Sequence, residues 1–459
     1  MSVSVIVLAA GQGTRMRSGS AKVLEEAAGR TLLAWVLAAL GDIGAEDLSI
    51  VVGHDADAVR RHCPDGASVV EQVPQNGTGH AASIGISGLA STTGTVLVVP
   101  GDMPLIRTES LERLIDLHHE VDAAATVLSV DLDEPTGYGR IIRSNGVVTA
   151  IVEEKDATDA QRQVTEVNTS VYAFDLELLA DALARVRNDN AQGEYYLTDV
   201  IGLLAAGDHP IAALRVDAEQ GIGVNTHRDL ATAAAVLRGR INDALLESGV
   251  WMLDPQRVYV DASATVEPGV KLYPETYLRG SSSVAAGAEI GPNVQLTNTS
   301  VGRGAKVQQA VAISAEIGDR ALVGPFAYLR PGAVLREGSK VGTFVEVKAS
   351  DIGEGSKVPH LSYIGDTTIG TSSNVGAGTV TVNYDGFAKN RTIIGNNVRI
   401  GSDTMLVAPV TVGDDAFTGA GSVITKDVPP GALAIERSAQ KNVEGYATKR
   451  QQRAEGDEG

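Results

Sequence analysis

One segment near the start of the chain combines glycines with two cationic side chains. The apolar run Val3–Leu8 leads into a Gly-rich segment that contains Arg15, and Lys22 follows seven positions later. Small residues let backbone N–H groups approach a phosphate, and the two cations supply positive charge. The segment is not a P-loop, because no Lys-Ser/Thr pair follows it, and Met16 stands where a dinucleotide fingerprint needs glycine. It still predicts a phosphate-binding turn at the end of a strand.

Two further predicted strand ends support this interpretation. Gln72 precedes a second glycine turn, Gly77-Thr78-Gly79, and Asp102 follows the apolar run Val96–Val99. Magnesium binds hard oxygen ligands and bridges phosphates, so a carboxylate at a strand end is suited to it. A lone aspartate at such a place is usually a turn former. The combination therefore carries the prediction of a magnesium-dependent nucleotide site.

A second set of residues beyond position 250 points to different chemistry. Arg330 and Lys348 each follow an aliphatic residue of a repeat and are 18 residues apart, so we expect them on adjacent coils about one strand spacing apart. Stacked like charges destabilise a sheet, and a bound phosphate would neutralise them. His360 lies in the next coil, and histidine is the side chain whose ordinary pKa suits proton removal near neutral pH.

Two alternative chemistries are excluded for this half. His360 is the only histidine beyond residue 250, so one subunit cannot supply a three-histidine zinc site. The single cysteine, Cys63, lies in the other half. We therefore expect no cysteine-linked covalent intermediate in this half.

The elements that position this second set follow from a six-residue period. Aliphatic residues recur at Val260, Val266, Leu272, Leu278, Val284, Ile290 and Leu296, and the pattern continues with slips to Val412. Neither a helix nor a flat strand has this period. It fits a three-sided coil of 18 residues, and it resembles the hexapeptide-repeat proteins, which implies a left-handed parallel β-helix. The pattern breaks between Thr381 and Ile393, which predicts an excursion there.

The first half has a different hydrophobic pattern. Strand-like runs at 3–8, 48–52, 96–99 and 123–130 alternate with helical patterns such as 32–40 and 110–118. This predicts an α/β domain with a doubly wound, mostly parallel, Rossmann-like sheet. We expect this domain at 1–227, a helical arm at 228–249, and the β-helix with a polar C-terminal tail at 250–459.

Composition narrows the function classes. The chain has 459 residues, 43% of them hydrophobic, and a net charge of −19, so nucleic-acid binding is not expected. No apolar run is long enough to span a membrane. The first basic residue is Arg15, so no secretory signal is expected. These observations predict a cytoplasmic enzyme.

The motif Leu8-Ala-Ala-Gly-Gln-Gly-Thr-Arg-Met16 with Lys22 resembles the sugar-1-phosphate nucleotidyltransferase family. Nearly the whole chain resembles the bifunctional N-acetylglucosamine-1-phosphate uridyltransferases and glucosamine-1-phosphate acetyltransferases. The resemblance implies Mg²⁺ bound by Asp102 and Asn225. It places UTP and the UDP-sugar on Leu8, Ala9, Ala10, Gly11, Arg15, Lys22, Gln72, Gly77, Thr78, Gly139, Glu153, Asn168 and Asn225.

For the second half the resemblance implies His360 as the catalytic base. It places the amino-sugar phosphate on Arg330, Lys348, Tyr363 and Asn374, and acetyl-CoA on Ala377, Asn383, Tyr384, Ser402, Ala420 and Arg437. It also implies a homotrimer with acetyl-transfer sites between subunits, and a role in cell-envelope precursor synthesis.

Three functions remain open on the residues alone. The favoured one is acetylation of glucosamine-1-phosphate followed by uridylyl transfer, which yields UDP-N-acetylglucosamine. The others are a single-activity nucleotidyltransferase with a structural or regulatory β-helix, and an oligomerising scaffold. A scaffold would have no need of stacked cations beside a potential base, so Arg330, Lys348 and His360 favour the first.

Overall fold

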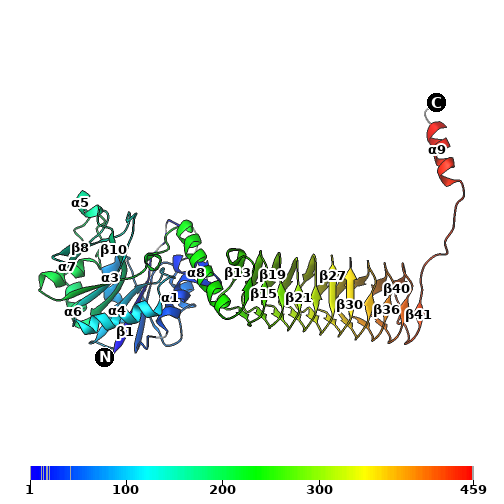
Figure 1. Cartoon of the computed structure of the whole chain (residues 1–459), viewed down its shortest axis with the longest axis horizontal. Coiled ribbons are helices and arrows are strands. Elements are labelled where there is room, and N and C mark those ends of the chain that lie inside the picture. The colour runs from blue at the N-terminus through cyan, green and yellow to red at the C-terminus, as the bar shows by residue number, and fades with distance from the viewer. Residues whose placement is uncertain are drawn as a thin grey trace. The chain divides into compact units, whose positions relative to one another are not determined.

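The computed structural model describes residues 2–11, 13, 15–16, 19, 21–41 and 43–456. Gln12 and Thr14 of the glycine-rich motif lie outside the described residues. The chain forms two compact units, residues 1–241 and 242–459, and Figure 1 shows the fold of each. The unit boundary falls inside helix α8 (His227–Glu247). The three-part division at 227 and 249 stays a prediction.

The first unit is built on a nine-stranded mixed sheet (Figure 1). Its main path runs β11-β7-β10-β6-β1-β4-β5, and the pairs are parallel except those of β10 with β6 and β7. The hairpin β8–β9 extends from β10. The strands are β1 (Val3–Ala9), β4 (Asp47–Val52), β5 (Ser68–Glu71), β6 (Thr95–Pro100), β7 (Ala125–Asp131), β8 (Arg140–Ser144), β9 (Val147–Val152), β10 (Glu166–Asp175) and β11 (Ile211–Arg215). The doubly wound, mostly parallel sheet is confirmed along this path.

Helices cover both faces of this sheet. The helices of this unit are α1 (Leu32–Leu40), α2 (Ala56–Arg60), α3 (Thr78–Ser87), α4 (Thr108–Glu120), α5 (Asp159–Arg162), α6 (Leu176–Leu183), α7 (Asp199–Ala206) and the first part of α8. Ile6 packs into one buried cluster with α3, α6 and α7, whereas its neighbours Val5 and Val7 pack into another with α1 and α4. A strand buried on both faces explains the unbroken apolar run of β1.

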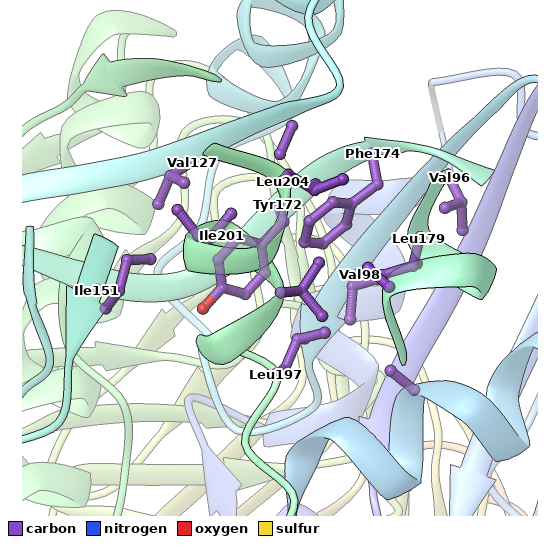
Figure 2. Packing of buried hydrophobic residues seen from close by; sticks show 14 of the residues in the cluster. Val96, Val98, Val127, Ile151, Tyr172, Phe174, Leu179, Leu197, Ile201 and Leu204 are labelled. Carbon is purple, nitrogen blue, oxygen red and sulfur yellow. The ribbon is translucent and has the colours of Figure 1, made fainter. Parts of the chain in front are cut away.

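Aromatic residues of β10 anchor the first of these clusters. The rings of Tyr172 and Phe174 stack with centroids 5.2 Å apart. Figure 2 shows them among Val98, Ile201 and Leu204. This packing holds β10, the strand that runs antiparallel to both β6 and β7.

The second unit is a three-sided left-handed parallel β-helix (Figure 1). Its sheets contain 11, 10 and 9 strands, and successive strands of the chain go to successive sheets. The first coil is β12 (Trp251–Met252), β13 (Val258–Val260) and β14 (Thr265–Val266), and the last strand is β41 (Leu433–Ala434). Repeat positions such as Leu272 and Ile290 are fully buried. The six-residue period is therefore confirmed as one inward side chain per side.

The predicted excursion is also present. Strand β34 (Val380–Val382) precedes it and β35 (Thr392–Ile394) follows it. Thr392 pairs with Thr367, so this coil is longer than the regular ones by the residues of the excursion. A bridge between Tyr384 and Lys389 closes the loop.

The C-terminal tail contains an element that the sequence pattern did not predict. Residues 446–456 form helix α9 (Tyr446–Gly456), and the side chains at 436–455 are exposed. A helix with no buried face has no apolar periodicity, which explains why the pattern missed it. Among the described residues, no helix is long and apolar enough to cross a membrane.

Candidate active sites

The carboxyl ends of β1, β4, β5 and β6 form one edge of the first sheet. Leu8 accepts a hydrogen bond from the N–H of Gly101 (2.9 Å), and Ala10 accepts one from the N–H of His54 (3.4 Å). Ala9 and Ala10 are buried, whereas Gly11 is exposed. The predicted phosphate turn therefore lies at the edge where doubly wound sheets bind nucleotides.

Gly13 and Lys22 lie against each other in this turn. Gly13 has a φ of +58°, and a Cβ there would lie 2.7 Å from Cβ of Lys22. Both the backbone conformation and the close approach exclude a larger residue. Glycine at this position therefore lets the turn close over Lys22.

The two predicted cations and the two predicted metal ligands converge. The Lys22 ammonium donates to the carboxylate of Asp102 and to Oδ1 of Asn225 (2.9 Å). Arg15 donates to the same Asn225 oxygen (2.8 Å). The side chains of Lys22 and Asp102 are only 11% and 18% exposed. Four residues from distant parts of the sequence thus form one small, half-buried cluster of cations and oxygen ligands.

Asn225 is held by a capping residue that the sequence analysis missed. The carboxylate of Asp229 accepts from the N–H groups of Asn225 (3.0 Å) and Thr226 (2.8 Å) at the start of α8. The Thr226 hydroxyl accepts from the N–H of Asp229 in return (3.2 Å). The Thr-x-x-Asp spacing is a capping signal that could have revealed this role.

A small apolar cluster packs against the residues that carry these cations and oxygen ligands. Met16 and Leu105, next to the phosphate turn and to Asp102, pack with Val224 and with Ala233 and Leu237 of α8. The first part of α8 therefore packs beside this cluster of cations and oxygen ligands.

The second glycine turn packs tightly on a neighbouring segment. A Cβ at Gly77 would lie 2.6 Å from the carbonyl oxygen of Tyr195, so only glycine fits. Thr78 accepts from the N–H of Leu197 (3.0 Å), and Gln72 donates to the carbonyl of Gly77 (3.0 Å). Gln72, Gly77 and Thr78 are therefore parts of one rigid turn.

The predicted sugar-side residues also lie together. The carbonyl of Gly139 accepts from the N–H of Asn168 (2.9 Å), and a Cβ at Gly139 would be 3.5 Å from the carboxylate of Glu153. Burial raises the pKa of Glu153, although a hydrogen bond from Thr198 acts in the opposite direction. The Asn168 amide donates to the hydroxyl of Tyr172 (2.7 Å). A half-buried carboxyl and an amide therefore flank a glycine backbone.

A buried ion pair that the sequence did not indicate holds the Gly139 loop. The Arg140 side chain is 2% exposed and pairs with Glu154 at 2.7 Å. Arg140 donates to the carbonyl of Tyr138, and Glu154 accepts from the N–H of Gly137 (3.2 Å). The hydrogen bond from Arg140 lowers the pKa of Glu154. The pair fixes both sides of the loop that presents Gly139.

Replacing Glu154 by alanine tests this clamp. A buried guanidinium would lose its carboxylate, so we expect a loss of about 2 kcal/mol in the free energy of unfolding of the first unit. Because the resemblance assigns Gly139 to the sugar phosphate, we expect the KM for that substrate to rise and the KM for the nucleotide to stay the same. Denaturant unfolding and steady-state kinetics measure both, and equal changes in both KM values would contradict a local role.

In the second unit, the predicted register of the two cations is confirmed. Leu329 of β25 (Ala327–Leu329) pairs with Val347 of β28 (Glu346–Lys348), and the N–H of Arg330 donates to the Val347 carbonyl (2.8 Å). Arg330, just after β25, and Lys348, the last residue of β28, therefore lie at matching positions of two paired strands on one side of the prism.

The argument from uncompensated charge was wrong, because carboxylates of the same chain pair with both cations. Arg330 contacts Glu346 at 2.8 Å and Lys348 contacts Asp366 at 2.9 Å. These side chains were missed because strand register gives neighbouring positions but not the reach of long side chains. The cation pair therefore does not by itself require a bound anion.

A third cation restores an excess of positive charge. The ammonium of Lys348 lies close to that of Lys389 in the excursion and lowers the pKa of Lys389. The hydrogen bond to Asp366 raises the pKa of Lys348. Arg330 is also close enough to act on Lys389. The sequence placed Lys389 in the excursion but assigned it no role.

Tyr363 and Asn383 belong to the same cluster. The Asn383 amide donates to Asp366 (2.5 Å) and to the hydroxyl of Tyr363 (3.4 Å), so both side chains lie beside the carboxylate that pairs with Lys348. Burial opposes ionisation of Asp366, but hydrogen bonds from Lys348 and Asn383 lower its pKa. Asn383, predicted on acetyl-CoA, therefore also borders the predicted phosphate site.

His360 and Asn374 lie on a different side of the prism. His360 ends β30 (Lys357–His360), Asn374 begins β33 (Asn374–Val375), and these strands pair through Lys357 and Asn374. Tyr363 begins β31 (Tyr363–Gly365) on the next side, just past the corner that follows His360. His360 is exposed and Asn374 is half-buried.

Most of the predicted acetyl-CoA residues form a column across successive coils. Ala377 accepts from the N–H of Asp403 (2.7 Å), and Ser402 accepts from the N–H of Gly421 (2.8 Å). The Arg437 guanidinium donates to the carbonyl of Ala420 (2.8 Å). Tyr384, in the excursion, is 59% exposed. The column ends in a cation, which suits a long ligand with an anionic end.

Comparisons with known proteins match both units. Residues 5–167 match the family model of the MobA-like NTP transferase domain. Residues 391–426 match that of the bacterial transferase hexapeptide (six repeats). The chain thus carries a nucleotidyltransferase domain and a hexapeptide-repeat domain of the acyltransferase type.

Relatives cover almost the whole chain. The bifunctional protein GlmU of Streptomyces coelicolor is 50% identical, over 97% of this chain and 94% of the relative. Those of Mycolicibacterium vanbaalenii and Corynebacterium aurimucosum are 48% and 47% identical, over 97% of this chain and 93% and 94% of the relatives. Since identity of this degree extends through both units, the chain belongs to the family of bifunctional GlmU proteins.

Proposed function

We propose that the two clusters are two active sites of one enzyme that makes UDP-N-acetylglucosamine. The second unit transfers acetyl from acetyl-CoA to glucosamine-1-phosphate, and the first transfers uridylyl from UTP to the N-acetylated product. The observation that carries this proposal is the presence of two independent groups of convergent cations, one in each unit.

In the first unit the reaction is in-line attack by a sugar-phosphate oxygen on the α-phosphorus of UTP, which expels pyrophosphate. Such transfers depend on positioning and charge neutralisation rather than on a protein nucleophile. In this proposal Arg15 and Lys22 bind phosphate oxygens. Gly139, Glu153 and Asn168 bind the sugar.

The Asp102 and Asn225 oxygens fit a magnesium ion. One carboxylate and one amide oxygen already converge on a cation, the Lys22 ammonium, and both are ligands that Mg²⁺ accepts together with phosphate oxygens. When bound there, the ion would neutralise charge that develops on the phosphates. Lys22 would then turn from these oxygens to the nucleotide.

Replacing Lys22 by alanine should slow uridylyl transfer more than about tenfold, since a phosphate-positioning charge is lost. Pyrophosphate release at saturating UTP measures this effect. Arg60, an exposed cation paired with Glu71 on the same unit, provides the matched control, Arg60→Ala. Unchanged turnover of Lys22→Ala would show that Lys22 takes no part in the transfer reaction.

In the second unit the amine nitrogen of glucosamine-1-phosphate attacks the thioester carbonyl, and the coenzyme A thiolate leaves. His360 takes the proton from the amine as general base. Arg330, Lys348 and Tyr363 bind the phosphate, with Asn374 on the sugar. The column of Ala377, Ser402, Ala420 and Arg437 binds acetyl-CoA, bordered by Asn383 and Tyr384.

We also propose that the enzyme is a cytoplasmic homotrimer. Phe326 and Phe344 stack on adjacent coils with centroids 5.3 Å apart, and Leu361 follows on the next coil. Their side chains are 52%, 60% and 62% exposed. A second copy of the chain would bury this apolar stripe, which lies beside the corner that carries His360.

Incubation with glucosamine-1-phosphate and acetyl-CoA tests the proposed function. Free thiol should appear, and later addition of UTP and Mg²⁺ should release pyrophosphate in an amount that follows the acetylated sugar. If the chain released pyrophosphate from UTP and N-acetylglucosamine-1-phosphate but released no thiol in the first step, it would be a single-activity nucleotidyltransferase.

A further inference from the structure

The side chain of Gln72 is held in one orientation at the edge of the first sheet. Gln72 follows β5 directly and is 3% exposed. Its backbone N–H donates to the carbonyl of Val52 at the end of β4 (2.8 Å). Its amide nitrogen donates to the carbonyl of Gly77 (3.0 Å) and lies 3.1 Å from Nδ1 of His80.

The chemistry of these partners fixes which end of the amide faces the ligand. A backbone carbonyl only accepts, so the nitrogen of Gln72 must face Gly77. An amide nitrogen only donates, so Nδ1 of His80 must accept and its ring proton must be on Nε2. Both amide hydrogens of Gln72 are then used inside the protein. The oxygen Oε1 is the atom that remains for a ligand.

The histidine is itself part of a rigid turn. His80 lies in the first turn of α3, just after Gly79, whose N–H donates to the carbonyl of Tyr195 (2.7 Å). A Cβ at Gly79 would lie only 3.0 Å from that oxygen. The imidazole therefore has a fixed place from which to hold the Gln72 amide.

We propose that His80 is a positioning residue that sets the base specificity of the nucleotide site. This rests on the proposed function, in which the first unit binds UTP, and it takes the Gln72 amide as the contact to the base. The uracil ring carries an N–H at position 3, whereas cytosine carries a lone pair there. An amide oxygen accepts from the first and repels the second, so the His80–Gln72 pair admits UTP and excludes CTP.

Without His80 one of the two amide hydrogens loses its acceptor. Only the Gly77 carbonyl then holds the amide nitrogen, so turning the amide to present its nitrogen to the base, which suits cytosine, costs one internal hydrogen bond instead of two. Removal of His80 should therefore reduce discrimination between the two bases in addition to weakening UTP binding. A merely structural role would reduce activity with both nucleotides in the same proportion.

The test is steady-state pyrophosphate release with UTP and with CTP for the full chain. In His80→Leu we expect kcat/KM for UTP to fall about tenfold, mainly through KM, and the preference for UTP over CTP to fall at least about tenfold. His80→Asn keeps an acceptor near the position of Nδ1 and should restore most of this preference. His62→Leu, at an exposed histidine that contacts Ala58, is the matched control.

Acetyl transfer by the second unit and the melting temperature report on folding. If His80→Leu has a lowered melting temperature, His80→Ala replaces it, and the same loss of preference for UTP over CTP is expected. A wild-type preference for UTP in a folded His80→Leu or His80→Ala protein would overturn the proposal, and so would an equal loss in His80→Asn. Failure of the proposed function would look different, since the unmodified chain would then release no pyrophosphate from UTP.

Discussion

Replacing His360 by alanine is expected to reduce acetyl transfer by about 10²- to 10⁴-fold, the usual contribution of a general base. The amine of the amino sugar must lose a proton as it attacks the thioester. His360 is exposed at the end of β30, next to the corner that leads to Tyr363. Uridylyl transfer should stay at the wild-type rate because His360 lies in the other compact unit.

Thiol release from acetyl-CoA with glucosamine-1-phosphate measures the loss. Lys357→Ala, at an exposed residue at the start of the same strand, controls for changes to the sheet and should keep both activities. Equal loss of acetyl and uridylyl transfer in a folded His360→Ala protein would contradict two separate sites. If His360→Ala still released thiol at the wild-type rate, His360 would not be the general base.

Replacing Asp102 by alanine should have the converse effect. We expect uridylyl transfer to fall about 10²- to 10³-fold, because a proposed magnesium ligand is lost together with the partner of Lys22. Asp102→Asn keeps an oxygen but loses the charge, so its activity should lie between that of the wild type and that of Asp102→Ala. Acetyl transfer should not change.

Pyrophosphate release from UTP and N-acetylglucosamine-1-phosphate, measured over a range of Mg²⁺ concentrations, checks this expectation. Asp57→Ala, at an exposed carboxylate paired with Arg60, is the control. Wild-type turnover of Asp102→Ala at a low Mg²⁺ concentration would contradict the assignment of this carboxylate to the metal.

Those parts of the structure that follow from periodicity were predictable from the sequence. A three-sided coil places one side chain inward every six residues, so Leu272, Ile290 and Val347 were recognisable as core positions, and all three are fully buried. The same register places Arg330 beside Lys348. The strand ends of the first unit follow from its alternation of strands and helices, which locates the phosphate turn and Asp102.

Contacts that depend on side-chain reach or on distant pairs were not predictable in this way. The pairing of Arg330 with Glu346 and of Lys348 with Asp366 depends on how far long side chains reach between neighbouring coils. The clamp of Arg140 and Glu154 joins residues with no local signal. Lys389 lies in the excursion, where the repeat provides no register.

The most direct test of two sites in one chain is a mixture of the variants His360→Ala and Asp102→Ala, supplied with glucosamine-1-phosphate, acetyl-CoA, UTP and Mg²⁺. Each variant alone should make almost no UDP-N-acetylglucosamine, while the mixture should make it at a rate set by the half-reaction that each retains. Substantial product from either variant alone, or none from a mixture whose members each perform their own half-reaction, would contradict this account.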